Sequence, residues 1–306
     1  MKNWNLDQVE NLTNKNVIIT GANTGLGFET ALAIASKGAN VIMACRSQER
    51  AESARQKIVS KYPNATIDIV LLDLGNLSKI ESFVKEYKSK YKTLDILINN
   101  AGVMTTPYMK TEDGFEFQNG VNHLGHFALT AQLFDLLKET KDSRLVIVSS
   151  IAHKNAVIDL DDYMFEQEEN YTPMKSYRQS KLSNLLFMKE LNRRMKDKTY
   201  TVKVLAAHPG VSRTELTRYV LSGFLAILLY PLVYLFTQSA KKGALPQLRA
   251  ALDNNAQTGE YYGPNGYKEM RGKPILVKSE PNANNVEDAQ ALWALSEKLT
   301  NVTFKV

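Results

Sequence analysis

Short β-rich segments alternate with helical segments from residue 16 to about residue 207. This alternation is typical of parallel strands joined by crossover helices, so we predict an α/β protein with one doubly wound parallel sheet and helices on both faces. The strands are mostly apolar, as strands buried on both faces should be. The predicted strands are Val17 to Thr20, Asn40 to Ala44, Thr66 to Leu71, Asp95 to Asn99, Leu145 to Ser149 and Val202 to Ala207. The predicted helices are Phe28 to Lys37, Glu49 to Lys61, Leu77 to Tyr91, about 117 to 138, and Tyr177 to Met195.

Composition excludes several classes of protein. Apolar residues make up 44% of the chain and charged residues 23%, which excludes disordered and collagen-like chains. The single cysteine, Cys45, cannot form an internal disulfide and is expected to be a small buried residue in a reducing compartment. The first twenty residues are polar, so we expect no signal peptide and a cytoplasmic protein. The net charge of +6 favours anionic partners but is too diffuse to indicate nucleic-acid binding.

A glycine-rich turn, TGANTGLG at residues 20–27, directly follows the first predicted strand. Glycines permit a tight turn and a close approach of the backbone to a pyrophosphate, and the following helix offers free N–H groups and the positive end of its dipole. The Gly-x-x-x-Gly-x-Gly spacing differs from Gly-x-Gly-x-x-Gly, so by itself the turn is equally an ordinary strand-to-helix connection.

The residues after the second and third strands bear on the choice of nucleotide. The second strand is followed by Arg46, where an acidic residue would bind the ribose of NAD. A guanidinium pairs well with a phosphate, so Arg46 predicts NADP rather than NAD, with a solvated surface arginine as the alternative. Asp73 is expected either to hydrogen-bond the adenine amino group or to cap the next helix.

Tyr177 and Lys181 lie four residues apart on one face of a predicted helix. A nearby positive charge lowers the pKa of a tyrosine from its ordinary value near 10, so this pair is a candidate proton donor or acceptor, although the spacing is also common on solvated helices. Ser150 follows the fifth strand at the carboxyl edge of the sheet, where ligands bind, and is placed to hydrogen-bond a carbonyl oxygen. Two other strands end at the same edge, in Asn99-Asn100-Ala101-Gly102 and in His208-Pro209-Gly210.

Taken together, these motifs resemble those of the short-chain dehydrogenase/reductase family. TGANTGLG, NNAG, SS, YRQSK and PGVSRT occur in the family's order across residues 15–214. The segments DGFE, VNHLGHF, SIAH and SKLSN are similar to the retinol dehydrogenase-like branch, and light-dependent protochlorophyllide reductases share part of this pattern. The resemblance implies a Rossmann-type fold and hydride transfer between a nicotinamide dinucleotide and an alcohol or carbonyl.

The resemblance also implies a role for each matching residue. Tyr177 would be the acid/base, Ser150 would orient the reacting oxygen, and Lys181 would lower the pKa of Tyr177 and bind the nicotinamide ribose. Asn122 would hold a proton-relay water. The phosphates would lie against Gly21, Asn23, Thr24, Gly25, Leu26 and Gly27, the adenosine side against Asp73, Leu74, Asn100, Ala101 and Gly102, and the nicotinamide side against Pro209, Gly210, Val211 and Thr214.

Three features depart from the simplest form of this pattern. The insert from Asp159 to Glu169, between Ser150 and Tyr177, carries six acidic residues and is expected to be a solvated loop. The N-terminal membrane helix of several animal retinol dehydrogenases is not seen here, so their membrane location is not carried over. His123 and His126 lie three residues apart, but with one cysteine and no clustered carboxylates we expect packed or hydrogen-bonded histidines and no metal site.

An uncharged apolar run, YVLSGFLAILLYPLVYLF, covers residues 219–236. It is long enough to span a bilayer, but a span would separate a predicted strand at 275–277 from its sheet. The resemblance places a substrate lid here, and an apolar lid implies a lipophilic substrate. Cationic residues flank the run, so peripheral contact with an anionic membrane surface is an alternative to a lid alone, and packing between subunits of a homodimer fits it equally.

We predict one domain over residues 1–306, with a cofactor and catalytic core at 15–214, an apolar lid at 215–245 and a C-terminal extension at 246–306. The extension contains a Gly/Pro-rich turn, TGEYYGPNG, a strand from Ile275 to Val277 and a helix near Asp288 to Leu299. The predicted function is an NADP-preferring oxidoreductase that interconverts a lipophilic alcohol and its aldehyde or ketone. The alternatives are a dinucleotide-binding sensor or scaffold without turnover, and a reductase of a polar carbonyl. The sequence does not fix the oligomeric state: for a homodimer, the resemblance offers either the helices at 117–138 and 177–195 or the apolar lid as the interface.

Overall fold

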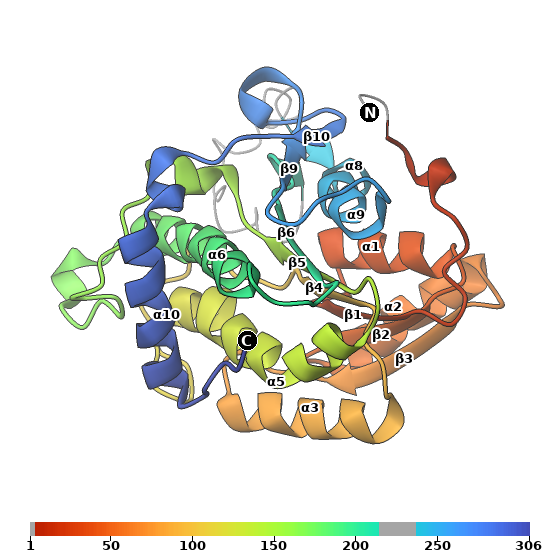
Figure 1. Ribbon diagram of the computed structural model, residues 1–306, viewed down its shortest axis with the longest axis horizontal. Helices are drawn as coiled ribbons and strands as arrows, with labels where there is room; N and C mark the ends of the chain where they lie inside the picture. Colours follow the sequence, from red (N-terminus) through yellow and green to blue (C-terminus); the bar gives the residue numbers. More distant parts are fainter. Residues whose placement is uncertain (1–3, 214–236) are drawn as a thin grey trace, which may run out of the picture.

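The computed structural model describes residues 4–213 and 237–306, so Thr214 and the apolar run at 219–236 lie outside the described residues. Eight strands form one sheet in the order β10-β9-β6-β5-β4-β1-β2-β3, in which only β10 runs antiparallel to its neighbour (Figure 1). The doubly wound parallel sheet and its six predicted strands are confirmed. The strands are β1 (Asn16–Thr20), β2 (Asn40–Cys45), β3 (Thr66–Leu71), β4 (Ile96–Asn99), β5 (Arg144–Val148), β6 (Lys203–Ala207), β9 (Tyr261–Pro264) and β10 (Pro274–Leu276).

Helices cover both faces of the sheet, and the central strands β1, β2, β4, β5 and β6 are buried between them. Ile18 of β1 packs in one apolar cluster with α3 (Leu77–Lys90), α5 (Gly125–Glu139) and α6 (Pro173–Met195). Its neighbours Val17 and Ile19 pack in a second cluster on the opposite face, which is covered by α1 (Gly25–Ala35), α2 (Gln48–Lys61) and α9 (Leu245–Leu252). This double burial explains why the strands lack alternation of polar and apolar residues.

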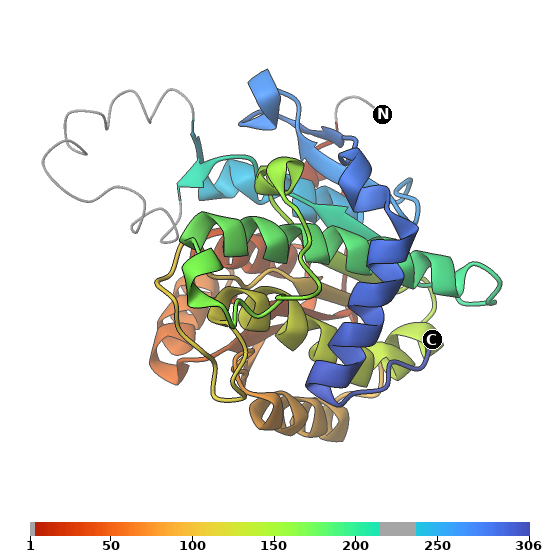
Figure 2. The same ribbon diagram turned by 90° about the vertical axis from the view of Figure 1, so that its left-hand side faces the viewer.

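The last helix, α10 (Val286–Thr300), packs on the outside of α6 and α5 and crosses over α6 in both views (Figures 1 and 2). Trp293 and Phe304 fill the space between these helices, with ring centroids 4.8 Å apart. The C-terminal extension therefore covers part of the two helices that the resemblance offered as one of two homodimer interfaces.

The order of the strands defines where ligands are expected to bind. Chain order reverses between β4 and β1, which are neighbours in the sheet, and both strands are followed by loops at the carboxyl edge. In open parallel sheets this reversal creates a crevice between the loops. The glycine turn after β1 and the NNAG segment after β4 meet at this point.

Two predicted segments are wrong in detail. The segment TGEYYGPNG was expected to be only a turn, but it contains β9, which pairs with β6 while Gly259 makes the turn at a φ of +82°. Tyr261 and Tyr262 are buried, and their burial stabilises the strand. The neighbouring glycine and proline residues are typical of turns, so the sequence pattern did not indicate a strand. The helix expected at 117–138 is interrupted, because α4 (Phe117–Asn119) leads into a π-helical segment, Gly120–Leu124, before α5 begins.

The acidic insert is only partly the solvated loop that we expected. Its apolar residues Tyr163, Met164 and Phe165 are buried, and the Tyr163 hydroxyl shares a 2.8 Å hydrogen bond with Ser183 Oγ on α6. The helix α6 itself begins one turn earlier than predicted, because Thr172 caps it and Pro173 occupies its first turn.

Only residues 237–245 of the predicted lid are described. They form β8 (Gln238–Ser239), which pairs with β7 (Ser212–Arg213), and the short helix α8 (Ala240–Gly243). Within residues 4–213 and 237–306, no helix is long and apolar enough to cross a membrane.

Candidate active site

The turn after β1 forms a cradle that requires glycine at three positions. Gly21 and Gly25 have φ values of +67° and +56°, in the left-handed region that favours glycine. A Cβ on Gly27 would lie 2.2 Å from the Gly21 carbonyl oxygen and 2.6 Å from Asn100 Nδ2, so no side chain fits there. Thr24 is the N-cap of α1 but makes no side-chain cap bond, which leaves the first N–H groups of the helix facing the turn.

An uncharged hydrogen-bond network behind the cradle ties β1 to β4 and α5. Thr20 Oγ1 accepts hydrogen bonds of 2.9 Å from the backbone N–H groups of Asn100 and Ala101. Asn100 Nδ2 in turn donates to the Thr20 carbonyl oxygen at 2.8 Å, and its Oδ1 accepts from Gln247 Nε2 at 3.1 Å. The sequence motifs TGANTGLG and NNAG are therefore held together by direct bonds.

His126 completes this network. Its Nδ1 lies 3.0 Å from the Asn122 carbonyl oxygen and its Nε2 lies 2.9 Å from Thr20 Oγ1. Because a carbonyl only accepts, Nδ1 carries the proton and Nε2 accepts from Thr20. Burial lowers the pKa of His126 to about 4, so the ring is neutral at pH 7. We define Thr20, Asn100, Gln247, Asn122 and His126 as the neutral network.

The four predicted catalytic residues converge beside this network and are all buried. Ser150 is the N-cap of a short 3-10 helix, Ile151–Asn155, and Tyr177 and Lys181 lie on α6. Lys181 Nζ lies 5.8 Å from the centroid of the Tyr177 ring and donates to the Val148 carbonyl oxygen at 3.3 Å. A Cβ on Gly102 would lie 3.3 Å from Lys181 Nζ, so the NNAG segment ends beside the Lys181 ammonium group.

The electrostatics of the pair differ from the sequence prediction. Burial raises the pKa of Tyr177 above its ordinary value, and a hydrogen bond with the Ser150 side chain acts in the opposite direction. Burial also lowers the pKa of Lys181 to about 8. Desolvation of the phenol therefore sets the net direction of the Tyr177 pKa shift, and the lowering by Lys181 that the sequence predicted is not the dominant effect. At neutral pH Tyr177 holds its proton and Lys181 is charged.

Asn122 is held rigidly by its side chain. Its Nδ2 donates to the Val103 carbonyl oxygen and to Ser180 Oγ, both at 2.9 Å, while its Oδ1 accepts from Val103 N at 2.7 Å. These bonds join the loop after β4 to α6 next to Tyr177. Asn122 lies in the π-helical segment, a feature that often marks functional sites.

The predicted adenosine side is assembled from three loops. Arg46 follows β2 and is exposed, and it makes no ion pair with the described residues. Asp73 Oδ1 accepts from Gly75 N at 2.9 Å, whereas Asn76 caps α3, so the capping alternative for Asp73 is wrong. Leu74 is buried, and its carbonyl oxygen would lie 2.3 Å from a Cβ on Gly125.

The loop after β6 forms the predicted nicotinamide side. The Pro209 carbonyl oxygen accepts from Gln238 Nε2 at 2.8 Å, and Gly210 has a φ of +62°. Val211 N donates to the Met270 carbonyl oxygen at 2.7 Å. These bonds hold the loop against β8 and the C-terminal extension.

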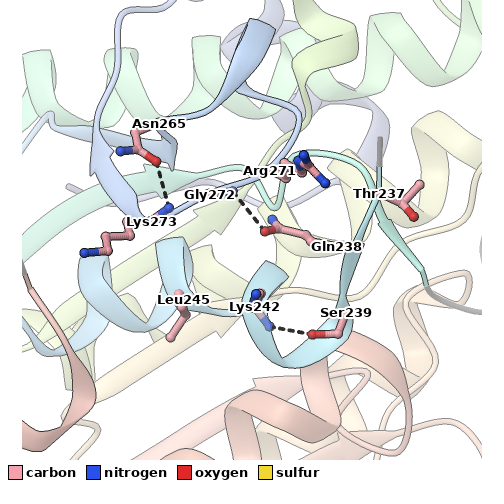
Figure 3. Close-up of a pocket in the computed structure, with 9 residues that line it drawn as sticks. All are labelled: Thr237, Gln238, Ser239, Lys242, Leu245, Asn265, Arg271, Gly272 and Lys273. Atoms are coloured by element: carbon pink, nitrogen blue, oxygen red, sulfur yellow. Dashed lines mark hydrogen bonds between the residues drawn. The ribbon is translucent and has the colours of Figure 1, made fainter. Parts of the chain in front are cut away.

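A separate cavity of about 610 Å³ is lined by residues of β8, α8 and the C-terminal extension (Figure 3). Its lining contains none of the predicted catalytic residues. Gln238 Oε1 accepts from Gly272 N at its centre, and three cationic residues contribute to its walls. The lining residues are Thr237, Gln238, Ser239, Lys242, Leu245, Asn265, Arg271, Gly272 and Lys273.

The arrangement fits a dinucleotide. The turn after β1 requires glycine at three positions, and the uncapped start of α1 supplies N–H donors for a pyrophosphate. The buried Lys181 and Tyr177 lie beyond the end of this cradle, next to Gly102. No group of three or more His, Cys, Asp or Glu side chains within the described ranges is placed to hold a metal ion. His123 instead bonds Ser296 Oγ at 2.9 Å.

Sequence reasoning missed a buried carboxylate beside the catalytic helix. Glu116 is fully buried, and its Oε2 accepts from Ser176 Oγ at 2.8 Å, one residue before Tyr177. It also caps α4 by accepting from Gln118 N and Asn119 N. The sequence signal was its place at the end of the DGFE segment, residues 113–116, to which no individual residue role was assigned.

Comparisons with known proteins agree with this architecture. Residues 15–164 match the short chain dehydrogenase family. The chain is 41% identical to retinol dehydrogenase 13 of Homo sapiens, over 94% of this chain and 85% of the relative, and 40% identical to human retinol dehydrogenase 12, over 96% and 89%.

Solved structures agree as well. The crystal structure of an uncharacterized protein from Mycobacterium paratuberculosis has a TM-score of 0.81 at 37% identity and covers 99% of both chains. A short chain dehydrogenase from Shigella flexneri, solved as a complex with NADP, has a TM-score of 0.63 at 20% identity, over 83% of this chain and 98% of that one. At that identity, the second likeness supports the fold alone.

Proposed function

The chain belongs to the short-chain dehydrogenase family and is retinol dehydrogenase-like, and on this basis we propose that it is an NADP-preferring oxidoreductase that interconverts lipophilic alcohols and their aldehydes or ketones. As a member of this family it is an NAD(P)-dependent oxidoreductase that acts on alcohols. The observation that carries the finer proposal is the convergence of Ser150, Tyr177 and Lys181 at the end of a glycine cradle. Arg46 at the adenosine end adds the preference for NADP.

The chain's own residues supply the proton and the orientation. When bound, the nicotinamide cofactor supplies the hydride. Ser150 Oγ orients the substrate oxygen, and Tyr177, which holds its proton at neutral pH, donates that proton to the oxygen. Lys181 provides a buried positive charge beside the phenol, which favours the tyrosinate left after transfer.

Preference for NADP rests on charge at the adenosine end. Arg46 is exposed just past β2 without an ion-pair partner among the described residues, so its guanidinium is available to a 2′-phosphate. No carboxylate occupies the position where NAD would need one. The lipophilic substrate is supported by the apolar sequence at 219–236 and by the names of the relatives, which are retinol dehydrogenases.

A spectrophotometric assay tests this proposal. Oxidation of NADPH and NADH is followed in parallel with lipophilic carbonyls, retinal included, and with small polar carbonyls of the sugar and hydroxy-acid type. We expect turnover of the lipophilic group with NADPH preferred at least about tenfold, and we expect Arg46→Ala to reduce that preference about tenfold. Preference for NADH, or turnover of polar carbonyls alone, would contradict the proposal. Binding of NADPH without turnover of any carbonyl would favour a sensor.

A further inference from the structure

A carboxylate in the C-terminal extension bridges the two loops that frame the proposed reaction centre. Glu269 Oε1 lies 2.8 Å from Lys154 Nζ, and its Oε2 lies 3.0 Å from His208 Nε2. Lys154 lies in the 3-10 helix that Ser150 caps, and His208 directly precedes Pro209 and Gly210. One side chain thus joins the loop of the predicted catalytic serine to the predicted nicotinamide loop.

The protonation of the bridge is fixed by its bonds. His208 is fully buried, and its Nδ1 accepts from Gly210 N at 3.2 Å, so Nε2 carries the proton and donates to Glu269. Burial opposes the charged form of Glu269, but the bonds from His208 and Lys154 outweigh it and lower its pKa to about 2. The carboxylate is therefore ionised throughout the working pH range.

The backbone around Glu269 is strained in a way that serves this placement. Lys268 and Glu269 are two successive non-glycine residues in the left-handed region, with φ values of +47° and +58°. Such conformations persist where the surrounding structure enforces them and cluster at functional sites. Here they direct Glu269 toward His208, while the next residue, Met270, accepts a hydrogen bond from Val211 N.

The segment that contains Glu269 and Met270 packs so closely on Gly210 that no side chain fits at that position. A Cβ on Gly210 would lie 2.4 Å from the Met270 carbonyl oxygen, so the strained segment packs directly on the loop. The ring of Tyr261 fills the space between the two loops, with centroids 5.3 Å from His208 and 5.6 Å from His153. The loops are thus joined by a charged bridge above a buried aromatic ring.

We propose that Glu269 is a positioning residue that fixes the separation between the Ser150 loop and the Pro209–Val211 loop. We call Lys154, Glu269 and His208 the clamp. Because a small misplacement of reacting groups costs much of the rate, loosening the clamp lowers turnover more than it lowers cofactor affinity. The dinucleotide remains held by the glycine cradle, which the clamp does not touch. This inference rests on the proposed function for its kinetic part only.

The test uses the full-length protein and two variants that break one contact from opposite sides. Glu269→Gln keeps an acceptor for His208 but loses the ion pair with Lys154, and Lys154→Met removes the same ion pair. We expect each to lower kcat about tenfold while the Kd for NADPH, from fluorescence titration, changes less than about threefold. Because both variants remove the same ion pair between Lys154 and Glu269, the double variant should have a kcat no lower than that of either single variant.

Asp95→Asn is the matched control. Asp95 also bridges two segments, accepting from Lys15 Nζ and from Asn16 N at 2.9 Å, but it does so at the amino edge of the sheet. We expect it to leave kcat unchanged even if its Tm falls. An unchanged kcat in Glu269→Gln, an equal loss in Asp95→Asn, or multiplied losses in the double variant would each overturn the proposal.

A second readout separates this inference from the proposed function. Hydrogen–deuterium exchange is compared between the wild-type protein and Glu269→Gln, without substrate. We expect faster exchange in peptides that contain residues 150–156 and 208–212, and no change around residues 20–30. If no carbonyl is turned over but this pattern appears, the proposed function fails and the clamp stands. If exchange is unchanged in both loops, the clamp is refuted whatever the activity.

Discussion

The neutral network and the clamp hold opposite ends of the same site by different physical means. The network is uncharged and is buried except at the half-buried Asn100. Its residues belong to β1, the loop after β4, the π-helical segment Gly120–Leu124, α5 and α9. In the clamp, Lys154 and Glu269 are 28% and 22% exposed, and the bridge depends on ionic charge. Short uncharged bonds between buried groups are insensitive to salt, whereas partly exposed ion pairs are screened by it. The neutral network therefore holds its end of the site independently of salt, whereas the hold of the clamp on the other end depends on ionic strength.

The largest effect is expected from filling the cradle. In Gly27→Ala the added methyl group would lie 2.2 Å from the Gly21 carbonyl oxygen, so the turn must move. We expect the affinity for NADPH to fall about 100-fold or more, equal to about 3 kcal/mol of binding energy. Titration of NADPH fluorescence measures it, with circular dichroism to verify folding. Affinity within about threefold of the wild type would mean that the cofactor does not use this turn.

Breaking the neutral network should chiefly lower stability. Thr20→Val removes a hydroxyl that serves Asn100, Ala101 and His126, and leaves their buried polar groups without that partner. We expect the free energy of unfolding to fall by about 3 kcal/mol in denaturant titrations. The control Thr140→Val loses one bond, to Leu94 N at the other edge, and should cost about 1 kcal/mol. If the free energy of unfolding falls equally in the two variants, the neutral network contributes no more to stability than a single hydrogen bond.

The charge of Lys181 should appear in the pH profile. Its pKa is lowered to about 8 by burial, so the cation is present below pH 8 and is lost as the pH rises through that value. We expect kcat/KM for NADPH to be level near pH 7 and to fall about tenfold for each unit above about pH 8, because this ratio reports the free enzyme. A profile that stays level to pH 10 would show that the Lys181 charge is not needed.

The smallest effect is expected from salt, and it separates the two regions directly. Raising the ionic strength from about 0.05 to about 0.5 M should lower kcat about twofold in the wild-type protein by screening the clamp. The same change should leave kcat of Glu269→Gln unaltered, because its ion pair is already absent. If salt lowers kcat equally in both proteins, the salt dependence of kcat does not arise from the clamp.

The same contrast explains what the sequence could predict. The strands, the glycine turn and the Ser150, Tyr177 and Lys181 set were predictable because they depend on local pattern and on strand ends meeting at one edge. The clamp was not, because its members are separated by up to 115 residues and none belongs to a motif.

Burial and local competition caused the remaining errors. The raised pKa of Tyr177 depends on desolvation, which the Tyr-x-x-x-Lys spacing does not reveal. Likewise, only Asp73 was predicted from the sequence as a cap, whereas the backbone places Asn76 at the N-cap of α3. The strand β9 depends on pairing with β6, a contact between residues more than fifty positions apart.

The most direct test of the central claim compares the wild-type protein with Tyr177→Phe. Binding of NADPH is measured by fluorescence, and reduction of retinal or the best carbonyl of the panel is measured in a single turnover at pH 7. The account predicts unchanged NADPH affinity and a rate lowered about 100- to 10,000-fold, since only the proton donor is lost. A Tyr177→Phe rate within about threefold of the wild type would contradict proton donation by Tyr177.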